Sequence, residues 1–416
     1  MGPTSPSSGS GTAIRNLTVL LSGIFVVTAA AAVSPALPAM EAHFSAVPGV
    51  SLLVPLVLTA PALSIAVAAP LSGAIMDRWG RRPVLLTSLV IVGLAGSAGY
   101  ALPSLPAILA SRVVLGLGVA GSITASTALI SDYLSGQERD RYLGYQSAVI
   151  WFGGTLFSQV GGLLADRHWR DPFLLFLAAL AVVPMALLCV PEPDRGSAPE
   201  RTSSPPTPER TRSSSAASGR LGLRLAVPYL VALLRTAAFF VIVVHLPFYL
   251  SSHFGAGGAQ IGTALAVMNL SAGAAGMAYG PLAKRFPLSS LFAGIFLAMA
   301  AGYLILGLAT GYPIILAGLI AAGAANGVVV PHLTLWLILM VPPATRGRAF
   351  GSLTTAIHLG QFVSPILVAP ISGRFALSGA YLACAGLLVG MALLFRAVDR
   401  AGGDRPGSGA GCASPR

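Results

Sequence analysis

Twelve long apolar stretches constrain the fold of this chain more than any other feature of its sequence. A helix needs about 20 mostly apolar residues to cross the hydrocarbon core of a bilayer. Hydrophobic residues make up 55% of the chain and charged residues only 9%, whereas soluble domains carry roughly 25% charged residues. The sequence therefore predicts an all-α membrane protein with twelve transmembrane helices. Their approximate ranges are 17–39, 50–76, 84–102, 106–130, 143–165, 173–190, 225–250, 261–283, 288–309, 313–340, 350–371 and 377–395.

The net charge of +12 reflects the expected topology of the chain. Most of the 25 Lys and Arg residues fall in the N-terminus, the even-numbered loops, a central linker and the C-terminal tail. Cytoplasmic loops of membrane proteins carry such an excess of basic residues. We therefore expect a multi-pass protein of the cytoplasmic cell membrane, with both termini in the cytoplasm. The lipid bilayer is then its partner, nucleic acid is not, and a monomer is expected.

Composition divides the chain into two hydrophobic halves and three polar segments. The segment between the sixth and seventh apolar stretches is rich in Pro, Ser, Arg and Glu, so it cannot bury enough surface to order itself. The predicted parts are a disordered cytoplasmic N-terminus (1–16), a six-helix bundle (17–190), a flexible cytoplasmic linker (191–223), a second six-helix bundle (224–396) and a disordered cytoplasmic tail (397–416).

An internal repeat relates the two halves. Eight identical residues recur at one offset of 207 residues, including Gly116 with Gly323 and the pattern R-x-R-x-x-G-x8-G, which begins at Arg139 and again at Arg346. A constant offset across several spans implies two similar bundles in the same orientation. Such parallel repeats are typical of one large architecture of membrane transporters.

A short charged loop between the second and third spans carries the most specific motif. It follows the pattern G-x-x-x-D-R-x-G-R-R and resembles the signature loop of the major facilitator superfamily. The residues that match are Gly73, Asp77, Arg78, Gly80, Arg81 and Arg82. The resemblance implies two pseudo-symmetric bundles, transport by alternating access, and a cytoplasmic conformational latch in this loop that is most stable when the transporter faces outward. We expect the carboxylate of Asp77 to lie among the arginines; a generic basic loop is the alternative.

Two further motifs resemble the same family. Arg112 and Gly116 match its fourth-span motif, whose arginine is associated with proton coupling; packing against carbonyl groups is the alternative for Arg112. The fifth span resembles the glycine motif of drug–proton antiporters, but Phe157-Ser158 replaces its Gly-Pro step. Close helix packing alone would also require its glycines. These are Gly144, Gly153, Gly161 and Gly162.

No acidic residue lies deep within a predicted span, so other groups are candidates for the path of substrate and protons. An unpaired cation at mid-membrane is costly, and a histidine changes charge near neutral pH. Each amide and histidine could instead serve helix packing. The candidates for proton coupling or the substrate path are Arg112, Arg235, His245, His358, Asn269, Asn326 and Gln159.

The favoured hypothesis is a secondary active transporter, not an enzyme, that exports small apolar compounds such as a drug or a secondary metabolite. Its expected partners are a small-molecule substrate and protons. We expect no cofactor and no metal; the proton gradient is the driving force, because the sequence contains no Walker A loop for ATP. The alternative is uptake of a small organic anion or nutrient, favoured by the buried arginines and the missing carboxylates.

Overall fold

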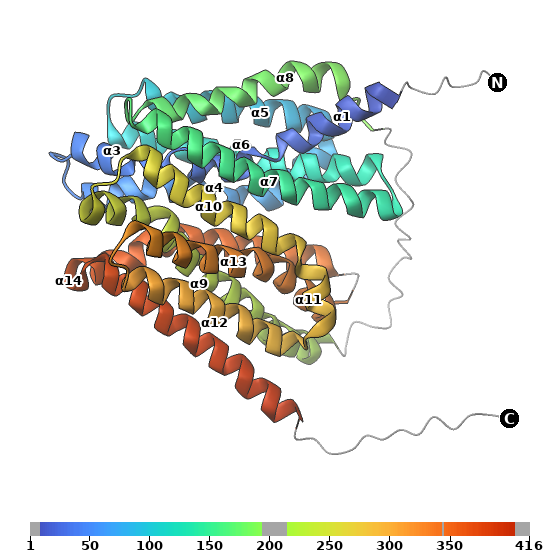
Figure 1. The fold of residues 1–416 in the computed structure, drawn as a ribbon. Helices are drawn as coiled ribbons and strands as arrows, with labels where there is room; N and C mark the ends of the chain where they lie inside the picture. The colour runs from blue at the N-terminus through green and yellow to red at the C-terminus, as the bar shows by residue number, and fades with distance from the viewer. Residues whose placement is uncertain (1–8, 194–213, 343–344, 404–416) are drawn as a thin grey trace, which may run out of the picture.

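The computed structural model describes residues 9–193, 214–342 and 345–403 (Figure 1). Within these ranges all regular structure is helical and no strand occurs, so the all-α prediction is confirmed. Eleven helices are long and apolar enough to cross a membrane, or twelve if one bent pair counts as a single span. That pair, Gly258–Met277 and Tyr279–Arg285, is bent by 53° and coincides with the eighth predicted span.

The first half of the chain contains the helices up to α8. Its first span is broken into short pieces, and a 3-10 turn precedes α8 in the sixth span. The elements are α1 (Gly9–Ser22), α2 (Phe25–Ala31), η1 (Ser34–Ala36), α3 (Leu37–His43), α4 (Val50–Trp79), α5 (Arg81–Ser97), η2 (Ala98–Tyr100), α6 (Leu105–Tyr133), α7 (Gly136–Ala165), η3 (Asp171–Leu177) and α8 (Ala178–Cys189).

The second half contains the remaining helices. These are α9 (Ser214–Phe254), α10 (Gly258–Met277), α11 (Tyr279–Arg285), α12 (Leu288–Gly307), α13 (Tyr312–Met340) and α14 (Arg346–Gly403). The last of them comprises two spans, 346–371 and 376–397, which meet at the non-helical backbone of Ala376.

Helices extend into all three segments that we expected to lack structure. α1 begins at Gly9, α9 begins at Ser214 and α14 ends at Gly403. Each extension contains Ala, Leu or Arg, which favour helix, and continues directly into an apolar span. The predictions for 1–16, 191–223 and 397–416 are therefore wrong where these helices run, and the rest of those segments lies outside the described residues apart from 191–193.

The two halves lie side by side, with α1–α8 in one layer and α9–α14 in the other (Figure 1). α4 packs against α14, and α7 packs against α10, so these four helices join the halves. We call the side on which α1 begins and α14 ends the inner side; it is the predicted cytoplasmic side. The opposite side, which carries η2 and the short segment between α12 and α13, is the outer side.

The same helix contact occurs in both halves. A methyl group added at Gly116 of α6 would overlap the carbonyl oxygen of Pro61 in α4, and one added at Gly323 of α13 would overlap the carbonyl oxygen of Met268 in α10. All four positions obey the 207-residue offset. The repeat in the sequence thus corresponds to a repeated packing geometry, in which glycine lets two backbones approach closely.

We expect Gly116→Ala to lower the free energy of unfolding by about 1–3 kcal/mol, because the added methyl group has no space against α4. Thermal unfolding in detergent would measure this. Gly386→Ala is the matched control: an added methyl group there contacts nothing within 4 Å, and the change should be neutral or slightly stabilising. Equal behaviour of the two variants would contradict the packing role of Gly116.

Candidate functional site

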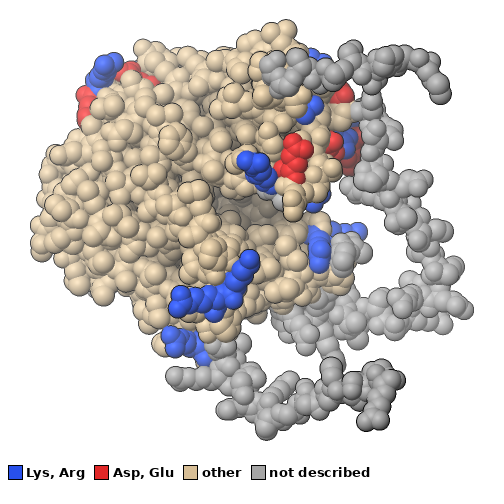
Figure 2. All heavy atoms as spheres, turned by 45° about the vertical axis from the view of Figure 1, so that its right-hand side comes forward, with Lys and Arg blue, Asp and Glu red and all other residues tan. Residues whose placement is uncertain are grey.

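A cavity of about 710 Å³ lies between the halves on the inner side. Figure 2 shows a hollow between the two halves of the molecule, with Lys, Arg and acidic side chains around it. Its walls come from α7 in the first half and from α10 and α13 in the second. The lining residues with large or polar side chains are Arg141, Tyr145, Ser147, Trp151, Met277, Val330, Pro331, Thr334, Leu335 and Ile338.

The walls of this cavity are mostly apolar. Among the lining residues only Arg141 is charged, and its Nε donates a 2.6 Å hydrogen bond to the hydroxyl of Tyr145. Gly144 borders the cavity, and a methyl group there would contact nothing within 4 Å. Apolar walls with a few polar groups are typical of small-molecule sites.

On the outer side α7 and α10 are in backbone contact. A methyl group at Gly162 would overlap the carbonyl oxygen of Gly258, and one at Gly262 would overlap the carbonyl oxygen of Ser158. Gly161 lies equally close to the carbonyl oxygen of Ala32 in the first span. Gly162 of the fifth-span motif therefore lies where the halves close the outer side, whereas Gly161 packs within the first half.

A carboxylate holds this closure together. The backbone N–H groups of Gly258 and Ala259, at the start of α10, donate to the Asp166 side chain at 2.5 and 2.9 Å. The N-terminus of a helix carries unpaired N–H groups and a partial positive charge, so an anion is favourable there. Asp166 follows the end of α7, and the contact therefore links the two halves.

Further hydrogen bonds connect the halves between the outer closure and the inner cavity. Ser34 donates to the carbonyl oxygen of Val243 at 2.6 Å. The predicted path residues take part as well: Gln159 accepts from Thr263 at 3.0 Å, and Asn269 donates to Ser158 at 3.3 Å. The structure is thus closed on the outer side and open on the inner side. In transporter terms it faces inward.

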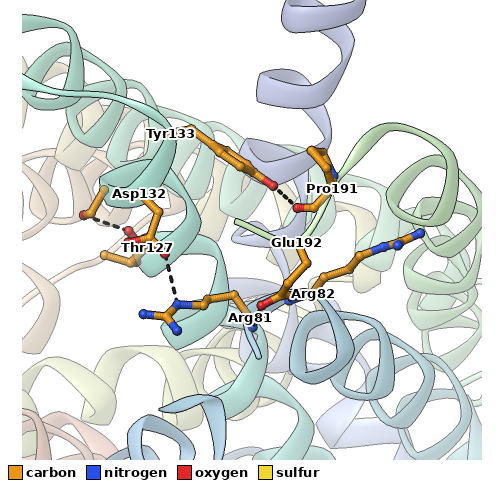
Figure 3. A network of polar contacts seen from close by, with 8 residues as sticks. Arg81, Arg82, Thr127, Asp132, Tyr133, Pro191 and Glu192 are labelled. Atoms are coloured by element: carbon orange, nitrogen blue, oxygen red, sulfur yellow. Dashed lines mark hydrogen bonds and ion pairs between the residues drawn. The ribbon is translucent and has the colours of Figure 1, made fainter. Parts of the chain in front are cut away.

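The signature loop lies on the inner rim (Figure 3). Gly80 separates α4 from α5 with a φ of +101°, which L side chains rarely adopt. The backbone N–H groups of Arg81 and Arg82 each donate at 2.7 Å to the carboxylate of Glu192. A methyl group at Gly80 would overlap that carboxylate. The glycine is therefore required both by the chain reversal and by the anion at the start of α5.

The arginine side chains of this loop contact other elements of the first half. Nε of Arg81 forms an ion pair with Asp132 at 3.0 Å, and Arg82 donates to the carbonyl oxygen of Leu187 at 2.6 Å. Asp77 is exposed and forms no hydrogen bond or ion pair with another described residue. Our expectation that its carboxylate lies among the arginines is not met, because Asp132 and Glu192 take that place.

An unpaired Asp77 is the arrangement expected of an open inner side. The resemblance implies a latch that is most stable when the transporter faces outward, whereas this structure faces inward. Gly73 has free space around it, and Arg78 is exposed. The latch role of the loop stays a prediction.

Arg112 lies inside the first half and not in the central cavity. Its side chain is 0% exposed, donates to the carbonyl oxygens of Ala95 and Gly96 at 2.8 and 2.6 Å, and packs over the rings of Phe173 and Phe176. It therefore binds the last carbonyl groups of α5, where a cation is favourable. The geometry agrees with the packing alternative; a role in proton coupling stays untested.

The other predicted path residues lie in the second half. Arg235 in α9 donates to Asn326 in α13 at 2.5 Å and to Thr236 at 2.6 Å, so this buried cation is solvated by neutral oxygens. His358 contacts the carbonyl oxygen of Thr354 one turn back in α14. None of them lines the inner cavity. His245 lines a separate cavity on the outer side. No cluster of potential metal ligands occurs in the described part of the chain.

Comparison with known proteins decides which family this architecture represents. The model of the major facilitator superfamily matches residues 19–249 and 228–411, which together span nearly all of the chain. The chain belongs to the major facilitator superfamily. It is thus a multi-pass membrane transporter and not an enzyme, and the family expected from the signature loop is confirmed.

Two relatives and one solved structure illustrate the similarity. The chain is 32% identical over 321 residues to the tetracycline resistance protein, class C, of Escherichia coli, covering 73% of this chain and 76% of that protein. It is 28% identical over 184 residues to multidrug resistance protein 1 of Bacillus subtilis (strain 168), covering 43% and 46%. The crystal structure of a D-xylose-proton symporter superposes with a TM-score of 0.75 at 18% identity, covering 92% and 97%, which shows a shared fold.

Sequence reasoning missed two carboxylates that bind helix N-termini near the functional site. Glu192 binds the start of α5 and Asp166 the start of α10. Both residues follow the end of a span, close to the N-terminus of another helix in the fold. The available signals were an acidic residue four positions after Gly162 and another at the head of the central linker.

We expect Asp166→Asn to open the outer side more often, because the charge at the start of α10 is lost. A carboxylate at an exposed helix N-terminus is worth roughly 0.3–1 kcal/mol, which corresponds to a roughly two- to fivefold change in an equilibrium. Ser34→Cys, in a background without the three native cysteines, would report this as faster labelling by an impermeant thiol reagent. Asp171→Asn is the control on the same side, and equal labelling in both variants would contradict the closure role.

We expect Arg112→Met to lower the free energy of unfolding by roughly 1.5–3 kcal/mol, because the carbonyl groups of α5 lose a charged donor. Proton movement by the folded fraction, measured per molecule in vesicles, should persist. Full stability together with complete loss of proton movement would instead assign Arg112 to coupling.

Proposed function

We propose that this transporter exports small, mostly apolar compounds from the cytoplasm in exchange for protons. One observation carries the proposal: the cavity of about 710 Å³ that opens on the inner side and has apolar and aromatic walls. A cargo dissolved in the cytoplasm or the inner leaflet reaches such a cavity directly. The relatives named for tetracycline resistance and multidrug resistance support the same direction and class of cargo.

Alternating access supplies the mechanism. Cargo enters between α7 and α13 while the outer contacts at Asp166 and Gly162 hold. Closing the inner side then brings the signature loop toward the second half, and the outer contacts separate. The indole of Trp151 and the hydroxyl of Thr334, which line the cavity from opposite halves, are the side chains we assign to cargo binding. Aromatic faces bind apolar rings with little loss of conformational entropy.

The alternative, uptake of a small organic anion, is favoured by the single charged lining residue. Arg141 would attract an anion at the inner rim. Arg235, which motivated this alternative in the sequence, bonds to Asn326 away from the cavity, so it supports the alternative less than its position in the chain suggested.

The decisive experiment uses inside-out vesicles that contain the protein and a pH-sensitive dye. In energised vesicles, tetracycline and ethidium should each release protons from the lumen, and Trp151→Ala should reduce this by roughly tenfold, the effect of about 1.4 kcal/mol of lost stacking. Phe152→Ala is the matched control, because the side chain of Phe152 is adjacent in sequence, is 67% exposed and does not line the inner cavity.

The opposite result separates the two hypotheses. Tetracycline or ethidium that moves no protons, together with accumulation of labelled benzoate in energised cells, would replace export by anion uptake. An equal loss in Trp151→Ala and Phe152→Ala would remove the assignment of the cargo site while leaving the direction of transport intact.

A further inference from the structure

The second half carries a groove on its surface that shares no lining residue with the inner cavity. Its volume is about 450 Å³, and its walls come from α10, α11, α12 and α13, together with Arg396 of α14. Apart from Arg396 and the hydroxyl group of Ser290, the groove is lined by apolar residues. Gly294 and Ala298 of α12 are exposed in it, so the groove opens toward the surroundings of these helices, which in a membrane are lipid.

The groove lies in the inner half of the bilayer. α12 begins on the inner side, and its lining positions run from Ser290 to Ala298. That distance is about 12 Å of helix at 1.5 Å per residue, close to half of the roughly 30 Å hydrocarbon core. The groove is therefore about as long as one leaflet is thick, which suits an acyl chain of an inner-leaflet lipid.

The internal repeat explains what opens the groove. At the 207-residue offset, Gly294 of α12 corresponds to Thr87 of α5. Ala298 corresponds to Ile91, whose Cγ2 lies 2.8 Å from the place of a methyl group on Gly118 of α6. Ile91 therefore fills the space between α5 and α6, whereas a methyl group on Gly294 would contact nothing within 4 Å. The small residues of α12 leave open a space that larger residues fill in the first half.

The bend between α10 and α11 shapes the same groove. These two helices are bent by 53° relative to one another. Ala275 before the bend and Leu282 and Phe286 after it all line the groove. In the first half the equivalent stretch of α4 continues as one helix to Trp79. The bend thus makes α11 a separate wall at the inner end of the groove.

The cations at the inner end of the groove have no acidic partner within their half. The sequence contains no Asp or Glu between Glu209 and Asp399, and the face drawn in Figure 2 shows only basic side chains on the second half. Arg396 lines the groove, and the guanidinium of Arg285 lies 5.8 Å from the centre of the ring of Phe286, which also lines it. Both arginines are exposed and form no ion pair with another described residue.

We propose that this groove binds an anionic phospholipid of the inner leaflet. One acyl chain lies along α12 against Gly294 and Ala298, and the phosphate lies beside Arg285 and Arg396. Basic pockets between transmembrane helices on the cytoplasmic side bind anionic headgroups in this way. A neutral lipid fills the same groove but leaves the cations without a partner, and this difference gives the preference for negative charge.

The lipid packs against helices that also line the inner cavity. Gly276 of α10 and Gly327 of α13 line that cavity, and the next residues, Ala275 and Val328, line the groove. Lipid binding therefore supports one wall of the cavity from outside the transport path. It depends neither on the proposed cargo nor on the direction of transport, so a negative result would leave the proposed function untouched.

The test measures lipid binding to the purified full-length protein in detergent by native mass spectrometry. Palmitoyl-oleoyl-phosphatidylglycerol is the anionic probe, and phosphatidylcholine with the same acyl chains is the neutral one. Each cation near the membrane surface should favour the anionic lipid roughly fivefold in affinity, so two cations give a preference of roughly 25-fold for the first molecule bound.

Arg285→Gln and Arg396→Gln should each weaken the binding of phosphatidylglycerol roughly fivefold and leave that of phosphatidylcholine unchanged. Arg348→Gln is the matched control, because Arg348 is an exposed cation on the inner side of the second half that does not line the groove. It should change neither affinity. All three side chains are exposed, so these variants should fold normally.

A second variant fills the groove with the residues of the first half. Gly294→Thr combined with Ala298→Ile should weaken the binding of both lipids roughly tenfold, the effect of displacing about two CH₂ groups of the acyl chain. Gly386→Thr is the control, because Gly386 is an exposed glycine of α14 that does not line the groove, and a methyl group there contacts nothing within 4 Å. Circular dichroism on each variant would exclude loss of fold.

Three results would overturn the proposal: equal affinity for the two lipids, charge variants that bind phosphatidylglycerol as well as Arg348→Gln does, or a filled groove that binds both lipids as before. Displacement of the lipid by free glycerol 3-phosphate would assign the site to a soluble anion instead. A dimer that the filled groove abolishes would assign the groove to a second copy of the chain.

Discussion

The backbone contact between α7 and α10 is the interaction on which the observed state of the molecule depends. Gly162, Gly258 and Gly262 let the two helices approach until their carbonyl groups lie where side chains would normally be. Asp166 fixes that approach by accepting from the first N–H groups of α10. The inner cavity lies nearer the other ends of the same two helices, where α13 completes its walls.

Two carboxylates bind helix N-termini, one on each side of the molecule, and they have different structural roles. Asp166 joins the halves on the outer side, and its contact must break when that side opens. Glu192 binds the start of α5 from within the same half, so its contact can persist through the cycle. The contact of Asp166 is therefore suited to a gate, and the contact of Glu192 is suited to holding the signature loop in a fixed position within its half. The inner rim can then move as one body with α4, α5 and α6.

The sequence predicted the architecture well because a bilayer restricts a chain to few solutions. The long apolar runs located the spans, and the 207-residue repeat anticipated a contact that recurs at Gly116 and Gly323. The site was harder to predict. Arg112 was an obvious candidate, yet its partners are carbonyl groups of α5, and no local pattern shows which helix end a buried arginine will face. Whether the carboxylate of Asp77 has a partner depends on the conformational state of the transporter, and a sequence motif does not encode that state.

The inner cavity has a consequence for inhibition that does not depend on the identity of the cargo. Its walls, α7 and α13, belong to different halves and must approach each other whenever the inner side closes. A rigid ligand wide enough to contact Trp151 and Thr334 at once would keep α7 and α13 apart and prevent the inner side from closing. Such a molecule would stall the cycle by binding the inward-facing state, so it would not need to resemble the cargo.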